Sequence, residues 1–413
     1  MNLKIPFRIS ALASVVGGLA ATLGGCAGRN LHSDLQAKPE ILLRKWSYGL
    51  TTGVANGPGS SVAGTRGVSK ARDAGDHGTE YSNAVLVGQT LIFGNRSQGI
   101  IALYPEFGQV RWTFNVMGGV TSELGVDKGS LYFGGGDGFL YSLSAETGKL
   151  NWRYEIRNPQ VSRPTVGGGR VFVTTTDDVV YALDAGTGKW LWHYRRRSAP
   201  PATILGASAP LLDGSEVLVG LSDGFLVSLS ENDGQLKWER KLHLGTKFTD
   251  VDAHPVLVDN ILYVPSYDGS LYALKRQKGE VVWRFDEGGS RQVAVEGDRL
   301  FLPSSTGSVF CLQRDSAKQI WKFDLDAGTP TQLVVTDRYV IVGSSFQYLY
   351  VIDKGTGQGV YRYNVGYGSG FTSSLTYDAD RKRLYALSGG GNLYAFSVQN
   401  APAHFPTHAV RKP

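Results

Sequence analysis

The stretch Asp184-Ala185-Gly186-Thr187-Gly188-Lys189-Trp190-Leu191-Trp192 decides the fold, because variants of it recur along the chain. Each variant places a turn a few residues before an aromatic residue, and the turn contains glycine in all but the variant before Trp321. These aromatic residues are Trp112, Trp152, Trp192, Trp238, Trp283, Trp321 and Tyr361. The intervals between them are 40, 40, 46, 45, 38 and 40 residues. Self-similarity at such a period is the mark of a repeat architecture, so one structural unit is expected per interval.

Each unit predicts short strands joined by tight turns. Ser130–Phe133 and Phe139–Leu143 are apolar runs separated by Asp137-Gly138, a pair that tolerates the positive φ of hairpin turns. Eight such hairpins occur, near residues 91–103, 131–143, 171–183, 217–229, 261–274, 300–312, 339–352 and 384–396. Units of 40–45 residues with this pattern are typical of the four-stranded blades of a β-propeller.

The count of outer strands predicts how the ring closes. Seven aromatic outer strands follow residue 100, and the last hairpin, 384–396, is followed by none. The missing strand is Ile41–Trp46 at the other end of the chain. We therefore predict an all-β, eight-bladed β-propeller of four-stranded blades, closed by an N-terminal strand that completes the last blade. Such closure hides sheet edges that would otherwise promote aggregation.

Composition agrees with β structure and excludes several classes of protein. The 413 residues include 54 Gly, 20 Tyr, 17 Phe and 8 Trp, which favours strands and turns. Two cysteines exclude a disulfide scaffold, an all-cysteine zinc site and an iron–sulfur cluster held by this chain alone. With 42 basic and 36 acidic residues, the charge gives no strong indication of nucleic-acid binding.

The N-terminus has the pattern of a targeting segment. Lys4 and Arg8 precede an apolar run, Ile9–Leu23, of 15 residues, which is short for a membrane span of about 20. The run ends in Leu23-Gly24-Gly25-Cys26, which is similar to a bacterial lipobox, with an ordinary secretory signal as the alternative. Acylation of Cys26 would anchor the chain stably to a membrane. Ala27, where inner-membrane lipoproteins typically carry Asp, then implies the periplasmic face of the outer membrane.

These signals predict the domain organisation. Residues 1–25 are expected to be a lipoprotein signal peptide, and residues 26–40 a lipidated N-terminus and flexible tether. The propeller is expected over 41–400, with a long loop at 47–80 because Trp46 and Trp112 lie further apart than one blade requires. A disordered tail is expected at 401–413.

The Asp-x-x-Thr-Gly-Lys-x-x-Trp repeat resembles the pyrroloquinoline-quinone-like propellers, a superfamily that includes quinone-dependent dehydrogenases. In those enzymes the tryptophans dock neighbouring blades, so the resemblance implies a packing role here. The enzymes also typically carry adjacent cysteines over the quinone, whereas Cys311 lies alone in an apolar strand and is expected to be buried. We predict no cofactor and no enzymatic activity, and retain a quinone-dependent dehydrogenase as an alternative.

Other catalytic and metal motifs are absent from the sequence. Among seven histidines only His404 and His408 have an i, i+4 spacing, and no helical pattern aligns them as metal ligands. No Walker loop is present, and the G-x-S-x-G match Gly220–Gly224 contains the hairpin pair Asp223-Gly224, so it does not indicate a nucleophile elbow. Arg195–Arg197 is a dense basic cluster, interpreted either as a solvated loop or as a contact for lipid head groups or an acidic partner.

Two stretches resemble the BamB lipoproteins, accessory proteins of the machinery that folds β-barrels into the outer membrane. Leu205-Gly206-Ala207-Ser208-Ala209-Pro210 is similar to that family's G-x-S-A-P segment. Thr249-Asp250-Val251-Asp252-Ala253-His254-Pro255-Val256 is similar to its S-D-V-D-x-x-P-V segment. The resemblance implies a non-enzymatic scaffold that binds a POTRA domain of BamA and other subunits of the machinery, and assists unfolded barrel proteins. A propeller serving another envelope partner is the alternative.

The resemblance also implies which residues contact BamA. They are Ile204, Leu205 and Gly206 in the first stretch, and Asp250 and Asp252 in the second. Residues at i and i+2 of an extended segment point to the same side, so both carboxylates are expected to face one partner. An aspartate pair that binds loop amides is the alternative. Leu205 stands where the family often has Arg, which leaves an apolar contact but removes a charge-assisted one.

Overall fold

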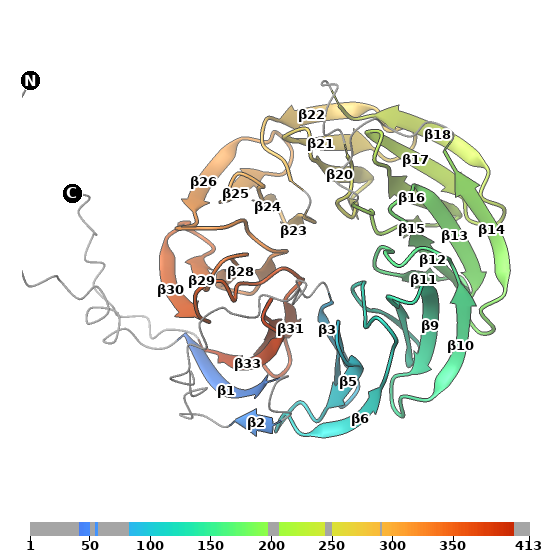
Figure 1. Ribbon diagram of the computed structural model, residues 1–413. Helices are drawn as coiled ribbons and strands as arrows, with labels where there is room; N and C mark the ends of the chain where they lie inside the picture. The colour runs from blue at the N-terminus through green and yellow to red at the C-terminus, as the bar shows by residue number, and fades with distance from the viewer. Residues whose placement is uncertain are drawn as a thin grey trace, which may run out of the picture. The chain divides into compact units, whose positions relative to one another are not determined.

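Eight antiparallel β-sheets follow one another around a ring in the computed structural model of the protein (Figure 1). The structure describes residues 41–49, 54–56, 82–196, 206–243, 250–289 and 291–399. Every regular element in these ranges is a strand. The described ranges contain no helix that is long and apolar enough to span a membrane. The predicted all-β, eight-bladed propeller is confirmed.

Each sheet, or blade, is a meander whose strands run in sequence from the centre of the ring to its rim (Figure 1). The first four blades contain β3 (Ala84–Val87), β4 (Thr90–Asn95), β5 (Gly99–Leu103) and β6 (Val110–Phe114); β7 (Gly125–Asp127), β8 (Ser130–Gly134), β9 (Phe139–Ser144) and β10 (Leu150–Glu155); β11 (Thr165–Gly167), β12 (Arg170–Thr174), β13 (Val179–Asp184) and β14 (Trp190–Arg195); and β15 (Leu211–Asp213), β16 (Glu216–Gly220), β17 (Phe225–Ser230) and β18 (Leu236–Lys241). Blades 5 to 7 contain β19 (Val256–Val258), β20 (Ile261–Ser266), β21 (Ser270–Lys275) and β22 (Val281–Phe285); β23 (Ala294–Glu296), β24 (Arg299–Pro303), β25 (Ser308–Gln313) and β26 (Gln319–Asp324); and β27 (Val334–Val335), β28 (Tyr339–Gly343), β29 (Tyr348–Asp353) and β30 (Gly359–Asn364).

Blade 8 joins the two ends of the propeller. It contains β31 (Thr376–Asp378), β32 (Arg383–Leu387) and β33 (Asn392–Val398), and its outer strand is β1 (Leu42–Gly49). β1 pairs antiparallel with β33 from Leu42↔Val398 to Gly49↔Asn392. Figure 1 shows this pairing as a blue strand beside a red one. The predicted closure by the N-terminal strand is confirmed.

The structure adds detail to the range 47–80, for which the sequence predicts a long loop. β1 continues to Gly49, and β2 (Val54–Asn56) pairs with it as a fifth strand of blade 8. The other residues between Gly49 and Ser82 lie outside the described ranges, as do residues 1–40 and 400–413. The expected signal peptide, tether and tail therefore stay predictions.

Burial differs between strands because each blade packs between two others. The middle strands are buried on both faces, as in β8, where Leu131 to Gly134 are all buried. Outer strands expose every second residue, as in β10, where Trp152 is buried between the exposed Asn151 and Arg153. The apolar core is therefore divided into clusters that lie between adjacent blades.

Neighbouring blades dock through a tryptophan and a glycine. In blade 2, the indole Nε1 of Trp152 donates a hydrogen bond of 2.9 Å to the carbonyl of Ala185 in blade 3. The Trp152 ring covers Gly188, whose φ is +70° and whose missing Cβ would lie 2.5 Å from the ring. The same packing joins the following pairs: Trp46–Gly108, Trp112–Gly148, Trp192–Gly234, Trp238–Gly279 and Trp321–Gly357. A β-bulge just before each aromatic residue sets the register of its outer strand.

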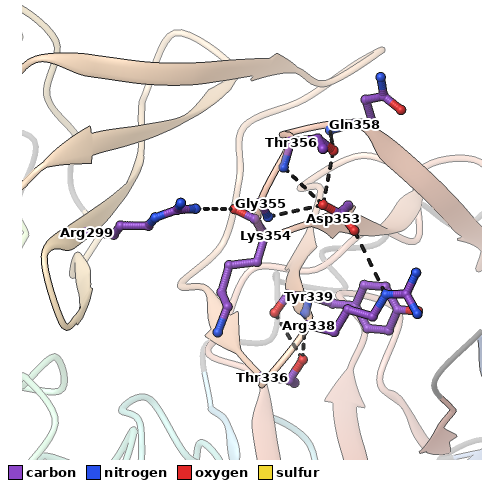
Figure 2. A network of polar contacts seen from close by, with 9 residues as sticks. All are labelled: Arg299, Thr336, Arg338, Tyr339, Asp353, Lys354, Gly355, Thr356 and Gln358. Carbon is purple, nitrogen blue, oxygen red and sulfur yellow. Dashed lines mark hydrogen bonds and ion pairs between the residues drawn. The ribbon is translucent and has the colours of Figure 1, made fainter. Parts of the chain in front are cut away.

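The aspartate of the repeat shapes the turn that receives the tryptophan. Figure 2 shows this in blade 7, where Asp353 Oδ1 accepts hydrogen bonds from the Gly355 amide (3.1 Å), the Thr356 amide (3.0 Å) and the Thr356 hydroxyl (3.0 Å). The next carbonyl, that of Lys354, accepts hydrogen bonds from Arg299 and Trp321 of blade 6, each of 3.0 Å. The repeat therefore encodes both a turn and the acceptor that the preceding blade requires.

The same docking contact closes the ring. Trp46 on β1 is 3% exposed, and its Nε1 donates a 3.0 Å hydrogen bond to the carbonyl of Pro105 in blade 1. Arg383 of blade 8 donates to the same carbonyl at 3.0 Å and forms an ion pair with Glu106. Blade 8 is thus joined to blade 1 by the same kind of tryptophan contact that is found between other neighbouring blades.

Replacing Trp46 with alanine should weaken the whole ring. The change removes a buried aromatic side chain and leaves the closing interface with a cavity, so we expect a loss of about 3–5 kcal/mol in the free energy of unfolding. Urea denaturation followed by circular dichroism measures it. Trp190→Ala is the matched control, because Trp190 is 49% exposed and docks no blade; it should cost less than about 1 kcal/mol. Equal losses in the two variants would refute this account of closure.

The docking glycines lead to a second prediction. Gly188→Ala should be destabilising, because its Cβ would overlap the Trp152 ring and because alanine is strained at φ +70°. Blade 6 carries Ala317, with φ +57°, at the equivalent turn position, so Ala317→Gly should relieve about 1 kcal/mol of strain. Thermal unfolding of both variants should show melting temperatures that move in opposite directions. A fall for Ala317→Gly would contradict the prediction.

Candidate functional site

The segments that lead into the innermost strands share a buried serine or threonine with a structural role. The Ser122 hydroxyl accepts a 2.9 Å hydrogen bond from the Gly134 amide of its own blade. Equivalent hydrogen bonds run from Gly94 to Ser82, from Thr174 to Ser162 and from Gly343 to Thr331. These hydroxyls fix each segment against the second strand of its blade. The residue after each one is thereby placed at the centre of the ring.

The two segments singled out from the sequence lie in direct contact. Ser208 donates a 3.0 Å hydrogen bond to the carbonyl of Ala253, and the His254 Nδ1–H donates one of 2.7 Å to the carbonyl of Ala209. These bonds join the entrances of blades 4 and 5 and involve residues 45 positions apart. Structure thus brings together two motifs that sequence alone relates only by resemblance.

Gly206 and Asp252 form the tightest part of this contact. A Cβ on Gly206 would lie 2.5 Å from Asp252 Oδ2 and 2.6 Å from its Cβ. The Asp252 side chain therefore occupies the space that any larger residue at 206 would need. The placement of Asp252 depends on a glycine in the neighbouring segment.

The expectation that both carboxylates face one partner requires a correction. Asp250 is buried, with 0% of its surface exposed, and its backbone carbonyl accepts a 2.9 Å hydrogen bond from the Tyr267 amide. Asp252 is partly exposed and borders a cavity. The segment is not a regular strand here, so the alternation rule does not hold. Asp252 can meet a partner directly, whereas Asp250 can act only by supporting the segment.

Burial changes the protonation of the residues at this contact. It raises the pKa of the Asp252 carboxyl from 3.8 to about 6, and the nearby Asp250 carboxylate adds to the rise. Oδ1 of Asp252 is buried without a hydrogen bond from the described residues. Burial lowers the pKa of His254 from 6.5 to about 4, and the Arg163 guanidinium contributes to the decrease. His254 is therefore neutral near pH 7, while Asp252 titrates just below it.

Asp252 and Gly206 line a cavity of about 500 Å³. Its walls come from the segments that enter the innermost strands of blades 2 to 8, so it lies at the centre of the ring. Charged side chains around it include Glu123, Arg163 and Arg291. The sequence interpretation did not identify these residues. Their position in the repeat could have identified them. Glu123 and Arg163 directly follow the buried Ser122 and Ser162, and Arg291 stands before β23 at the place where those two serines stand before β7 and β11.

Several residues predicted from sequence lie elsewhere. Cys26, Ile204 and Leu205 are outside the described ranges. Cys311 is buried, as predicted, and burial raises the pKa of its thiol to about 11. The described residues contain no group of three or more His, Cys, Asp or Glu side chains arranged to hold a metal ion.

The basic cluster Arg195–Arg197 is largely used within the fold. Arg195, the last residue of β14, pairs with Asp177 at 2.9 Å. Arg196 pairs with Asp223 and Glu239 of blade 4, and its guanidinium lies 4.1 Å from the centroid of the Phe225 ring. The Arg196 side chain, 16% exposed, does not match the interpretation as a solvated loop, whereas the Arg195 side chain lies at a strand end and is 60% exposed. Arg197 lies outside the described ranges.

With the fold and the site in place, a family match can be assigned. The family model described as "Outer membrane protein assembly factor BamB" matches residues 96–275 and 267–402, well over half of the chain. The protein belongs to the BamB family. The BamB of Alteromonas naphthalenivorans is 34% identical over 175 residues, which cover 40% of this chain and 42% of that protein. The chain spans about half the length of the curated BamB relatives it matches.

Solved structures share the propeller fold. The crystal structure of BamB from Moraxella catarrhalis superposes with a TM-score of 0.68 at 24% identity, covering 76% of this chain and 96% of that one. The quinohemoprotein alcohol dehydrogenase of Comamonas testosteroni superposes with a TM-score of 0.65 at 15% identity, covering 90% and 78%. At these identities the likeness concerns the fold alone.

Asp252 and His254 should have opposite effects on the pH dependence of stability. Asp252 has a raised folded pKa, so its burial costs free energy that grows as pH rises from about 4 to 6. His254 has a lowered folded pKa, so its contribution to stability is lost as pH falls from 6.5 towards 4. Each effect is on the order of 2 kcal/mol, and they largely cancel in the unaltered protein.

Single substitutions separate the two effects. Relative to the unaltered protein, Asp252→Asn should gain more free energy of unfolding at pH 7 than at pH 4.5. His254→Gln should show the reverse, with its relative gain at pH 4.5. Urea titrations at the two pH values measure both differences. If each variant differs from the unaltered protein by a constant amount, the assigned pKa shifts are wrong.

Proposed function

We propose that this protein is a non-enzymatic lipoprotein scaffold of the β-barrel assembly machinery that binds BamA and assists the insertion of barrel proteins into the outer membrane. The observation that carries the proposal is the direct packing of the Gly206–Pro210 segment on the Asp250–Val256 segment. Membership of the BamB family supports the assignment to assembly. The contact surface would be the mouth of the cavity at blades 4 and 5, where Asp252 is accessible.

The two segments suit docking because they are held in place before a partner arrives. The hydrogen bonds from Ser208 and His254, and the Gly206–Asp252 contact, fix their relative position. A preformed surface loses less conformational entropy on binding than a mobile one. Ile204 and Leu205 would extend this surface with apolar contacts.

The anchor and location form part of the same proposal. Cys26, at the end of an apolar run, would be acylated and hold the chain on the periplasmic face of the outer membrane. A membrane-attached ring is positioned to bind the periplasmic part of a barrel-assembly subunit. Unfolded barrel proteins would then be substrates of the complex.

Calorimetric titration with the periplasmic part of BamA tests the binding site. Asp252→Asn should weaken binding by tenfold or more, which corresponds to about 1.4 kcal/mol, because it removes the accessible charge. Since the same change should stabilise the fold at pH 7, unfolding would not explain the loss. Gly206→Ala should weaken binding as well, because its Cβ displaces the Asp252 side chain.

Asp286→Asn serves as the matched control. The Asp286 side chain is 81% exposed and lies outside both segments, so BamA affinity should not change. Asp250→Asn should lower thermal stability together with affinity, as expected of a buried supporting residue. Unaltered affinity in Asp252→Asn and Gly206→Ala would refute the site. Absence of BamA binding by the unaltered protein would favour another envelope partner.

A further inference from the structure

Arg163 is a cation in the central cavity whose guanidinium forms no hydrogen bond or ion pair with the described residues. It follows the buried Ser162 at the entrance of blade 3. It lies close enough to His254 for its charge to lower the pKa of that imidazole. A cavity-lining guanidinium with no anionic partner among the described residues has its donors available, so this group is suited to binding an anionic ligand.

Another part of the cavity wall is a chain of hydrogen bonds across blades 2, 6, 7 and 8. Gln332 Nε2 donates to Gln292 Oε1 at 2.9 Å, and Gln332 Oε1 lies 2.7 Å from the Ser374 hydroxyl. Ser374 Oγ lies 2.5 Å from Glu123 Oε1, and the Ser374 amide donates to the same oxygen at 2.9 Å. The Glu123 carboxylate is therefore engaged by Ser374.

A second arginine borders the same space. Arg291 donates a 2.8 Å hydrogen bond to the carbonyl of Thr372, and it forms no ion pair within 4 Å among the described residues. Asp252 is the remaining carboxyl of the cavity wall, and burial raises its pKa to about 6. His254 is neutral near pH 7. Glu123 and Asp252 bring negative charge to the cavity wall, but neither forms an ion pair with Arg163, which is left as a cation without a close counter-charge among the described residues.

We propose that the central cavity binds a carboxylate carried by a peptide, at the chain end or on an acidic side chain, with Arg163 as the primary contact and Arg291 of blade 6 as a second cation of the cavity wall. The planar guanidinium matches a carboxylate in two parallel hydrogen bonds. A volume of about 500 Å³ lies in the range of roughly 300–1,000 Å³ that is usual for small-ligand sites.

This site goes beyond BamA docking and does not depend on it. Arg163 belongs to blade 3, whereas the proposed BamA contacts belong to blades 4 and 5. Binding of a small peptide can be measured without BamA. Failure of one proposal is therefore distinguishable from failure of the other.

Calorimetry with the full-length protein in detergent tests the proposal with three probes. They are N-acetyl-triglycine with a free carboxylate, the same peptide with an amidated C-terminus, and inorganic phosphate. The free acid should bind and the amide should not. Binding of phosphate in place of the free acid would show an anion site for a non-peptide ligand and would overturn the peptide assignment.

Variants at Arg163 identify the contact. Arg163→Gln should weaken binding of the free acid at least tenfold, and Arg163→Lys should restore part of it, because the charge returns without the planar fork. Arg157→Gln is the matched control, since the Arg157 side chain is 82% exposed and its one ion pair among the described residues is with Glu155, the last residue of β10. Thermal unfolding verifies that each variant is folded. Equal binding by Arg163→Gln and the control, or no binding of the free acid, would overturn the proposal.

Lower pH should strengthen binding, because a protonated Asp252 no longer repels the ligand. The charged groups that face Asp252 are Asp250 on its own segment and Arg291 from blade 6. The affinity for the free acid should be higher at pH 5.5 than at pH 7.5, and Asp252→Asn should reduce this difference. An unchanged pH dependence in that variant would exclude Asp252 from the site.

Discussion

The packing of an outer-strand indole on a glycine of the next blade is the contact on which the ring depends. A tryptophan ring packs closely on a surface without a Cβ, and glycine adopts positive φ without strain, so glycine meets both requirements; blade 6 carries Ala317 at this position instead. The hydrogen bond from the indole then fixes the angle between blades. Because Trp46 repeats this contact, the last blade is bound to the first by the same interaction that joins other neighbouring blades.

This constraint also positions the site. Once the blades are docked, the segments that enter the innermost strands converge at the centre of the ring, and their buried hydroxyls fix the residues that follow. Blades 4 and 5 use this convergence to bring Gly206 against Asp252. Ring geometry, rather than either segment alone, therefore explains why one carboxyl reaches the cavity and another is fully buried.

Much of the fold was predictable because its signals are local and repeated. The hairpins near 131–143 and 171–183 correspond to β8–β9 and β12–β13, and the strand before Trp46 was found by counting. The innermost strands were not delimited, because elements as short as Val334–Val335 give no periodic pattern. The role of Arg196 could not be predicted from the sequence, because its partners Asp223 and Glu239 lie 27 and 43 positions away.

The sequence by itself determined the number of blades, the strand that closes the ring, and the resemblance of segments 205–210 and 249–256 to BamB. Each of these depends on spacing or on residue type within a few positions. Tertiary structure alone decided the burial of Asp250, the exposure of Asp252 and the gathering of Arg163 and Arg291 around one cavity. These features depend on contacts between segments that are tens of residues apart. Burial and electrostatic environment are properties of that packing, and no local pattern encodes them.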